Sequence, residues 1–250
     1  MDVSLYQAAA AMNATARWQD LISENLAAAS IPGARKQEIS FSDVQAGMAS
    51  NNSGAANASD YIPSVKTVTN FQTGELCPTG NSMDFALEGP GFFTVQLPNG
   101  QHAYTRGGEF QLNAKGQLVN QEGYPVLGSG GSLQFNPNSS DAISVSATGD
   151  VSQGTETKGK LQITEFQHPE NLTPLGPGFF RPDGPDAQPT AAVSTQVRQG
   201  FIEAANMSPT TEMASLITAM RMFESNQKVL QMQSDRMSRV ITDLGGTTSS

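Results

Sequence analysis

The chain has 250 residues, 23 of them acidic and 14 basic, which gives a formal net charge of −9 at pH 7. This length is enough for one large domain or two modest ones with a buried core, and an acidic chain without a run of Lys and Arg is not expected to bind nucleic acid. The single cysteine, Cys77, excludes an intramolecular disulfide framework and a cysteine-rich zinc site.

The N-terminal segment is predicted to form a long helix with one apolar stripe. From Leu5 onward, most residues spaced three and four apart are apolar, and Ile31-Pro32-Gly33 ends the pattern. The same segment has no basic start, continuous apolar core or cleavage site, so we expect no cleaved signal peptide. No stretch is long and apolar enough to span a bilayer, and we expect a soluble protein that is not membrane-inserted.

The segment after this helix, residues 37–80, is predicted to be a linker and an extended connecting segment. Residues 45–60 in particular are small, polar and without period, which is typical of a flexible linker.

The middle of the chain, residues 81–199, is predicted to be a β-rich outer domain. Two hairpins are expected, at residues 92–106 and 109–119, because in each case alternating segments flank a turn rich in Asn and Gly. Further short strands are expected at residues 124–127, 143–147 and 160–166. Phe166 falls out of step with the alternation, which suggests a bulge in the last of these strands.

The pentapeptide Gly-Pro-Gly-Phe-Phe occurs twice, at residues 89–93 and 176–180. The residues on either side of the two copies do not match, so they are interpreted as two turns and not as an internal repeat. Gly-Pro-Gly favours a tight turn, and the two Phe residues can anchor the segment after the turn. The first copy is expected to open a strand and the second a long loop.

The C-terminal segment is predicted to form a helix of about ten turns. Ser208 is suited to cap its start, Pro209 to occupy its first position, and Gly245-Gly246 to end it. The spacing of three and four again selects apolar residues, with only Gln227 and Ser234 interrupting the run. This stripe is narrow and the other faces are charged, which indicates a packing seam.

The predicted fold is therefore α+β, with discontinuous long terminal helices of coiled-coil type and a central β-rich domain. We expect residues 1–36 and 200–245 to form the helical domain. The two apolar stripes can either form the core of the monomer or be covered by other subunits. Burying a Leu, Ile, Met or Phe side chain contributes about 1.5–3 kcal/mol of stabilisation. Full burial of both apolar stripes would therefore contribute well over about 10 kcal/mol. A head-to-tail contact that does not close on itself produces a helical filament.

No group of residues in the sequence is typical of an enzyme. Neither glycine-rich pentapeptide continues into Lys-Ser or Lys-Thr, His102 and His168 have no partner at metal-ligand spacing, and no nucleophile elbow occurs. The protein is predicted not to be an enzyme and to have no cofactor, no metal site and no small-molecule substrate.

Three stretches of the sequence resemble the axial proteins of the bacterial flagellum, specifically the rod proteins of the basal body. Residues 24–36 are similar to the family's Asn-Leu-Ala-Asn…Thr-x-Gly-[Phe/Tyr]-Lys signature. The matching positions are Asn25, Leu26, Ala27, Gly33 and Lys36. The positions that differ are Ala28, Ile31 and Ala34. Residues 89–128 are similar to the family's central segment almost throughout. Residues 199–232 are similar to its closing motif at Gly200, Glu203, Asn206, Glu212, Met213, Arg221, Phe223 and Glu224.

The resemblance implies a structural subunit of the flagellar basal-body rod, in the part that crosses the periplasm. It implies export through the flagellar type III apparatus without a cleaved signal peptide. It also implies that the terminal helices line the inner wall of the rod as a coiled coil, while the β domain faces outward. Through these helices the chain would polymerise with copies of itself and with other axial proteins of the rod and hook. The start "MDVSLYQAAAAM" and the short span before the β domain favour the proximal over the distal rod.

The residues expected at the assembly interface combine the two apolar stripes with the motif positions. They are Leu5, Met12, Ile22, Asn25, Leu26, Ala27, Gly33, Gly200, Glu203, Asn206, Met213, Leu216, Met220, Phe223, Leu230, Met237, Ile241 and Leu244. The rival interpretation is a secreted β-rich binding or adhesion module with helical tails. That class predicts a conventional signal peptide or an exposed aromatic platform; neither is visible, and the single Trp18 falls in the N-terminal helix.

Overall fold

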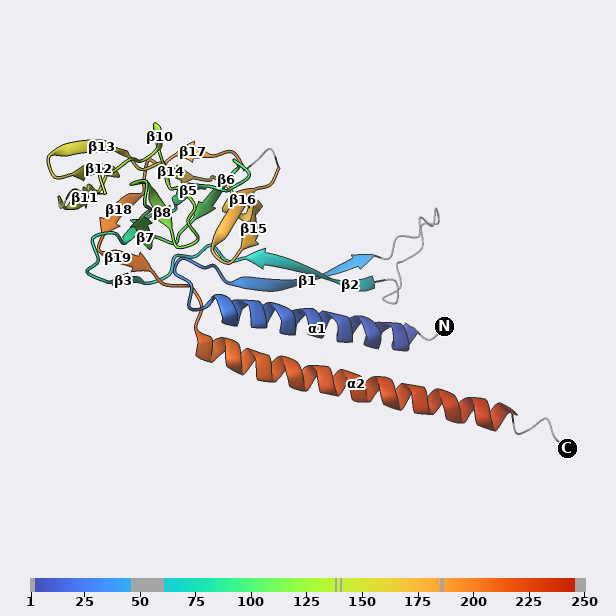
Figure 1. Cartoon of the computed structure of the whole chain (residues 1–250). Coiled ribbons are helices and arrows are strands. Elements are labelled where there is room, and N and C mark those ends of the chain that lie inside the picture. The colour runs from blue at the N-terminus through green and yellow to red at the C-terminus, as the bar shows by residue number, and fades with distance from the viewer. Residues whose placement is uncertain (1–2, 46–60, 138, 140, 185–186, 246–250) are drawn as a thin grey trace. The chain divides into compact units, whose positions relative to one another are not determined.

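The computed structural model describes residues 3–45, 61–137, 139, 141–184 and 187–245 of the chain (Figure 1). The chain divides into two compact units. The helical unit comprises Met1–Leu26, Gln37–Val68 and Pro209–Ser250, and the β unit comprises Ala27–Lys36 and Thr69–Ser208. The prediction of a mixed fold with a mostly β central part and two helices is confirmed.

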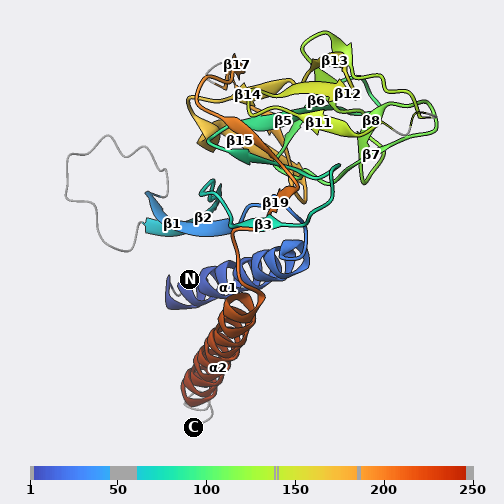
Figure 2. The ribbon, with the colours of Figure 1, turned by 90° about the vertical axis from the view of Figure 1, so that its left-hand side faces the viewer.

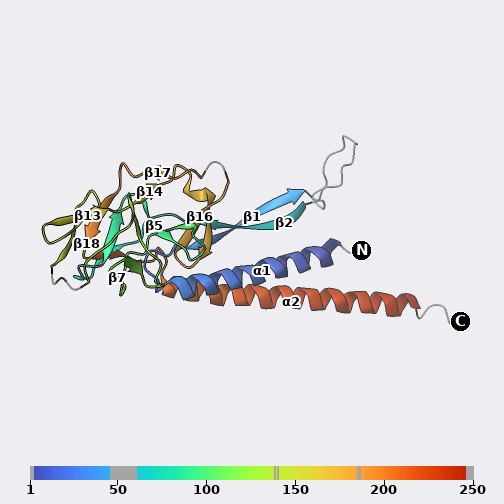
Figure 3. The ribbon, with the colours of Figure 1, turned by 45° about the horizontal axis from the view of Figure 1, so that its top comes forward.

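The helical unit contains two long helices, which run without a break in Figure 3. Helix α1 spans Val3–Ala28 and helix α2 spans Pro209–Gly245, which is 37 residues or about 55 Å. Pro209 opens α2 because its missing N–H would have had no intrahelical partner, and Glu212 in the first turn suits the positive end of the helix dipole. Both helices are confirmed, while their packing as a coiled coil stays a prediction.

The helical unit also contains a pair of extended strands. Strand β1 covers Gln37–Gln45 and pairs with strand β2, Tyr61–Thr69, in a two-stranded sheet. Most of the predicted flexible linker, residues 46–60, lies outside the described part of the chain. No helix in the described part of the chain has the length and apolar character needed to cross a membrane.

The β unit is built around a six-stranded antiparallel sheet with the strand order β15-β16-β6-β5-β14-β17 (Figures 1 and 2). Its strands are β5 (Phe92–Gln96), β6 (His102–Thr105), β14 (Ile163–Glu165), β15 (Leu172–Gly176), β16 (Phe179–Pro182) and β17 (Thr190–Ala191). A short 3₁₀ helix, Pro169–Asn171, precedes β15. The predicted hairpin across Asn99-Gly100 is the β5–β6 pair and is confirmed.

The remaining strands form smaller antiparallel groups. One sheet has three strands, β11 (Ile143–Val145), β12 (Asp150–Gln153) and β13 (Glu156–Lys160). Four strand pairs complete the unit: β3 (Leu76–Pro78) with β19 (Phe201–Glu203), β4 (Phe85–Glu88) with β18 (Gln196–Gln199), β7 (Phe110–Leu112) with β8 (Leu118–Asn120), and β9 (Leu127–Gly128) with β10 (Gly131–Ser132). The β7–β8 pair confirms the second predicted hairpin.

The segment 160–166 was predicted to be one strand with a bulge, and the structure shows two strands instead. Strand β13 ends at Lys160 and β14 begins at Ile163. Between them the backbone changes partner, because Leu161 N–H donates to the carbonyl of Gly149 and Gln162 N–H donates to the carbonyl of Leu127. Phe166 is out of step with Leu161 and Ile163 because it packs on the opposite face, with Phe92 and Tyr104, while Ile163 packs with Phe93.

The two Gly-Pro-Gly-Phe-Phe segments lie on either side of the same strand. Phe93 of β5 and Phe179 of β16 both pair with Thr105 of β6. The first segment opens β5, as predicted. The prediction that the second opens a long loop is wrong, because Gly176 ends β15, Pro177 and Gly178 form the turn, and the two Phe residues begin β16.

Apolar side chains cover both faces of the six-stranded sheet. On one face, Phe93 and Val95 belong to the larger cluster of buried residues, which extends under the three-stranded sheet. On the other face, Phe92 and Phe180 form a second cluster with Tyr104. Most of these rings meet edge to face, an arrangement that adds to the stability gained by burial.

Candidate functional site

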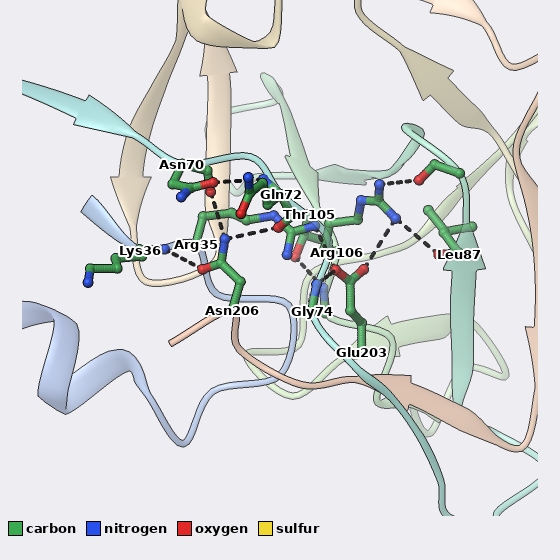
Figure 4. A network of polar contacts seen from close by, with 12 residues as sticks. Arg35, Lys36, Asn70, Gln72, Gly74, Leu87, Thr105, Arg106, Glu203 and Asn206 are labelled. Atoms are coloured by element: carbon green, nitrogen blue, oxygen red, sulfur yellow. Dashed lines mark hydrogen bonds and ion pairs between the residues drawn. The ribbon is translucent and has the colours of Figure 1, made fainter. Parts of the chain in front are cut away.

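Polar side chains of the β unit form a buried network. The segment that follows α1 (residues 29–36), the segment that follows β2 (residues 70–74) and the segment that precedes α2 (residues 203–206) meet there (Figure 4). We call this network the junction and define it by Arg35, Arg106, Glu203 and Asn206.

Glu203, the last residue of β19, lies at the centre of the junction. Its Oε1 is 2.7 Å from Nη2 of Arg35 and accepts a hydrogen bond of 2.8 Å from the N–H of Gly74. Its Oε2 accepts a hydrogen bond of 3.2 Å from Nη1 of Arg106. The backbone carbonyl of Glu203 also accepts a hydrogen bond of 2.7 Å from the N–H of Gly33. One residue therefore contacts the chain after α1, after β2 and after β6.

Arg106, the residue after β6, extends the network into the first glycine-rich turn. Its guanidinium donates a hydrogen bond of 3.1 Å to the carbonyl of Leu87 and another to the carbonyl of Gly89. It lies over the ring of Phe92, 5.2 Å from the ring centre. Burial lowers the pKa of Arg106 to about 10, an effect that Glu203 opposes and Arg35 reinforces. Arg106 remains charged at neutral pH.

The junction buries more positive than negative charge. The side chains of Arg35, Arg106 and Glu203 are 1%, 2% and 0% exposed, so two cations share one carboxylate with almost no access to water. Nε and Nη1 of Arg35 find no hydrogen-bond acceptor among the described residues. Removing the carboxylate would leave both charges uncompensated, which makes Glu203 the residue on which the junction depends.

Two asparagines act as clamps between backbone segments. In the β unit, Oδ1 of Asn206 accepts a hydrogen bond of 2.6 Å from the N–H of Lys36. Its Nδ2 donates hydrogen bonds of 2.8 Å to the carbonyl of Asn70 and of 2.9 Å to the carbonyl of Gln72. In the helical unit, Asn25 donates a hydrogen bond of 2.8 Å to the carbonyl of Gln37 and accepts one of 2.9 Å from the N–H of Gln37. Each clamp pairs with backbone groups much as a neighbouring strand would.

Gly33 allows the chain after α1 to reach the junction. Its φ of +72° lies in the left-handed region, and a Cβ there would come within 2.4 Å of the backbone carbon of Arg106. Ala34, where the signature has an aromatic residue, is buried with 1% exposure. Gly200, which separates β18 from β19, also has a positive φ of +80° and donates its N–H to the carbonyl of Asp84.

The predicted apolar stripe of α2 divides between two neighbouring faces of the helix. Leu216, Phe223 and Leu230 are half-buried and share a face with Ala219, which is fully buried. Met213 and Met220 are both 53% exposed and share the other face with Ile217, which is 54% exposed. Met237 is also exposed. The structure brings the first group together and leaves the second open.

On α1 the predicted interface residues differ in burial. Ile22 and Asn25 are buried, Met12 and Leu26 are half-buried, and Ala27 is exposed. The side chains of Leu5, Ile241 and Leu244 are outside what the structure describes. The remaining predicted residues, in contrast, lie in the β unit: Gly33, Gly200, Glu203 and Asn206. Glu203 and Asn206 are junction residues, Gly33 donates its N–H to Glu203, and Gly200 directly precedes β19.

The sequence did not single out Arg35, Arg106 or Gly74 as functional residues. Arg35 lies inside the quoted N-terminal signature, between two of its matched positions, which was a usable signal. Arg106 and Gly74 reach Glu203 across 97 and 129 residues, and no spacing pattern indicates such contacts. Within the described part of the chain, no three His, Cys, Asp or Glu side chains lie together as metal ligands would.

Glu109, at the start of the β7–β8 hairpin, has a raised pKa. Burial raises the pKa most, the nearby Asp84 raises it further, and a hydrogen bond from Gln121 partly offsets both. The folded state therefore favours the protonated form, and ionisation above that raised pKa costs stability. We expect Glu109→Gln to stabilise the protein at pH 7, by less than about 1 kcal/mol, and to be neutral in acid below the usual carboxyl range.

Urea unfolding of both proteins across that pH range measures the difference. A variant less stable than the parent at pH 7, or equally stabilised at acid pH, would contradict this assignment.

Comparisons with known proteins give matches in the β unit and in α2. Residues 86–153 match the family model described as "Flagellar hook protein FlgE/F/G D1 domain". Residues 198–244 match the model described as "Flagellar basal body rod FlgEFG protein C-terminal". The second match starts in β18 and includes Glu203 and Asn206 of the junction together with nearly all of α2.

Several curated proteins are similar over almost the whole chain. The flagellar basal-body rod protein FlgF of Mesorhizobium japonicum is 31% identical over 98% of this chain and 99% of its own length. FlgF of Caulobacter vibrioides is 29% identical over the same shares of both chains. The flagellar basal-body rod protein FlgG of Buchnera aphidicola subsp. Schizaphis graminum is 32% identical over 90% of this chain and 93% of its own.

Proposed function

This chain belongs to the family of flagellar basal-body rod proteins, and from that premise we propose that it polymerises through its terminal helices into the axial drive shaft of the flagellum. The supporting observation is the apolar surface of α2. Met213, Ile217 and Met220 form an exposed apolar group on one face of a 37-residue helix. A helix that keeps such a surface in water gains free energy when another subunit covers it.

The methionines on this helix suit a surface that meets more than one neighbour. Met222 and Met232 are exposed in addition to Met213, Met220 and Met237. Methionine has three rotatable bonds and a polarisable sulfur, so it packs against surfaces of different shape. A subunit at a boundary between different axial proteins needs contacts of this adaptable kind.

Within the rod, we assign the chain to the proximal part, which we equate with the FlgF type. The relatives called FlgF from Mesorhizobium japonicum and Caulobacter vibrioides align over 98% of this chain and 99% of their own length. Relatives called FlgG align over slightly less of it, for example 90% for the Buchnera protein and 91% for that of Bacillus subtilis. The distal position is the alternative.

The partners in this proposal are copies of the chain and the other axial proteins of the rod and hook. The chain reaches the rod through the flagellar type III export apparatus. In the assembled state the helical segments form the shaft, residues 37–80 connect, and the β-rich domain faces outward.

Electron microscopy of isolated basal bodies tests the proposal. A strain carries the chain with a small tag in the exposed turn between β5 and β6, and gold-labelled antibody marks its position. We expect label along the rod nearest the inner membrane. Label at the distal end of the rod would contradict the proximal assignment, and normal basal bodies without the chain would contradict the structural role.

A further inference from the structure

A groove in the β unit lies beside the six-stranded sheet and has a volume of about 510 Å³. Residues of β6, β14 and β17 line it, and none of the junction residues does. The volume falls within the range of about 300–1,000 Å³ that is typical of small-molecule sites. We call it the Tyr104 groove and define it by five lining side chains with unused polar groups: His102, Tyr104, Ser129, Lys160 and Gln162.

Tyr104 in β6 is the strongest sign that the groove takes a ligand. Only 5% of the residue is exposed, and its ring packs edge to face on Phe166, with 4.9 Å between the ring centres. Its hydroxyl forms no hydrogen bond with another described residue, yet it is not sealed from solvent, so a group in the groove can reach it. Burial raises the pKa of Tyr104, so the hydroxyl stays protonated and can donate at neutral pH. A ligand oxygen that accepts this hydrogen bond recovers free energy lost in burying the hydroxyl.

Four further side chains bring unused polar groups to the same groove. Lys160 forms no ion pair within the described part of the chain. The side chains of His102, Ser129 and Gln162 form no hydrogen bond with another described residue. Lysine, serine, glutamine and tyrosine side chains all donate hydrogen bonds, and lysine adds a positive charge. The groove is therefore rich in donors and suits a ligand rich in oxygen.

No Asp or Glu is among the described residues that line the groove. Two carboxylates contact lining residues from outside it, and each already accepts a hydrogen bond. Asp150, opposite Lys160 in the β12–β13 pair, accepts a hydrogen bond of 2.6 Å from Thr148. Glu165 accepts one of 2.6 Å from Thr195. Because these hydroxyl groups already bind both carboxylates, the ammonium group of Lys160 remains available to an anionic ligand.

We infer that the Tyr104 groove binds a small sugar acid, a molecule with several hydroxyl groups and one carboxylate. The carboxylate pairs with Lys160, and a hydroxyl oxygen accepts the hydrogen bond from Tyr104. The amide of Gln162 both donates and accepts, which matches the hydroxyl groups of a sugar. Ile163 and Ala191 supply apolar lining for the C–H surfaces of the ring. The inference does not depend on assembly of the chain into a rod.

Nuclear magnetic resonance of the ¹⁵N-labelled full chain tests the groove with sodium D-glucuronate as the probe. We expect the side-chain amide signals of Gln162 and the backbone amide signal of Thr164 to shift and to saturate in the millimolar range. D-glucose has the same ring without the carboxylate, and acetate has the carboxylate without the ring. Each should bind at least about threefold more weakly than glucuronate. Equally tight binding of glucose or acetate overturns the assignment to a sugar acid, and the absence of a saturable shift overturns the site.

Tyr104→Phe tests the unpaired hydroxyl with little risk to the fold. The substitution keeps the ring on Phe166 and removes no hydrogen bond within the described part of the chain. We expect an unchanged Tm and glucuronate binding that is about threefold to tenfold weaker. Tyr124→Phe is the matched control, because the ring of Tyr124 packs on Phe179 outside the groove, and it should bind glucuronate like the parent. Unchanged affinity in Tyr104→Phe, or an equal loss in both variants, overturns the role of Tyr104.

Lys160→Gln tests the charge. Gln at this exposed position keeps a donor, so the variant should bind glucuronate only as tightly as it binds glucose. Lys115→Gln removes an exposed lysine from the β7–β8 turn, outside the groove, and should keep the preference for glucuronate. A preference that persists in Lys160→Gln, or that is lost in Lys115→Gln as well, overturns the pairing of the ligand carboxylate with Lys160.

Discussion

Glu203→Ala is expected to destabilise the β unit by about 3–5 kcal/mol. Among the described residues, this carboxylate is the single anion paired with Arg35 and Arg106, and all three side chains are at most 2% exposed. Without it, two buried positive charges face each other and the N–H of Gly74 loses its acceptor. Because the free energy of unfolding of a domain is only about 5–15 kcal/mol, this substitution would remove a large part of the stability of the β unit.

The measurement must report on the β unit alone. Trp18 lies in α1, so its fluorescence follows the helical unit and is unsuitable. Hydrogen exchange of peptides from β5 and β6 gives the opening free energy of the sheet directly.

Glu88→Ala provides the matched control. Glu88 forms an ion pair of 2.6 Å with Arg198 in the same unit, but the two side chains are about half exposed, at 51% and 50%. Exposed pairs contribute at most about 1 kcal/mol, so this variant should change little. Equal effects of Glu203→Ala and Glu88→Ala would show that the junction does not hold the β unit together.

Leu230→Asp and Met237→Asp are expected to prevent the chain from entering the rod. Leu230 is half-buried on the face of α2 that includes Phe223, and Met237 is exposed further along the helix. Covering each apolar side chain is worth about 1.5–3 kcal/mol, and a buried aspartate adds the cost of desolvating its charge. Each variant should therefore lower incorporation by at least roughly tenfold.

Quantitative immunoblotting of isolated basal bodies gives the incorporated amount, and hydrogen exchange of the β unit checks that the rest of the chain is folded. Ser225→Asp introduces the same charge at an exposed position of α2 that lies away from both apolar faces, and should assemble normally. Normal assembly of Leu230→Asp and Met237→Asp would exclude their face of α2 from the interface. A defect in Ser225→Asp as well would show that any added charge disturbs the helix.

Local signals in the sequence were enough to predict the helices and the hairpins. Pro209 and the glycines after residue 244 mark the ends of α2, and Asn99-Gly100 marks the β5–β6 turn, because these residues act on the backbone within a few positions. The expected apolar stripes were found on the same helices. The division of the α2 stripe into a covered and an exposed face was not predictable, since it depends on what the rest of the unit covers.

Features that depend on distant parts of the chain were missed. The second glycine-rich turn was expected to open a loop, because the prolines and glycine after Arg181 suggest one, yet Phe179 and Phe180 find β6 as a neighbour and form a strand. Arg106 looked like an ordinary strand-end residue. Its importance arises only when Glu203, 97 residues further on, is placed beside it. Glu203 and Asn206 were named through family resemblance, and their contacts came from the structure.

The clamp between Asn206 and Lys36 joins backbone positions 170 residues apart, one just before β1 and the other just before α2. One side chain therefore fixes the separation of backbone positions 36 and 206 without the help of the chain between them. Insertions in the loops that join the β strands leave this separation unchanged, because those loops take no part in the clamp.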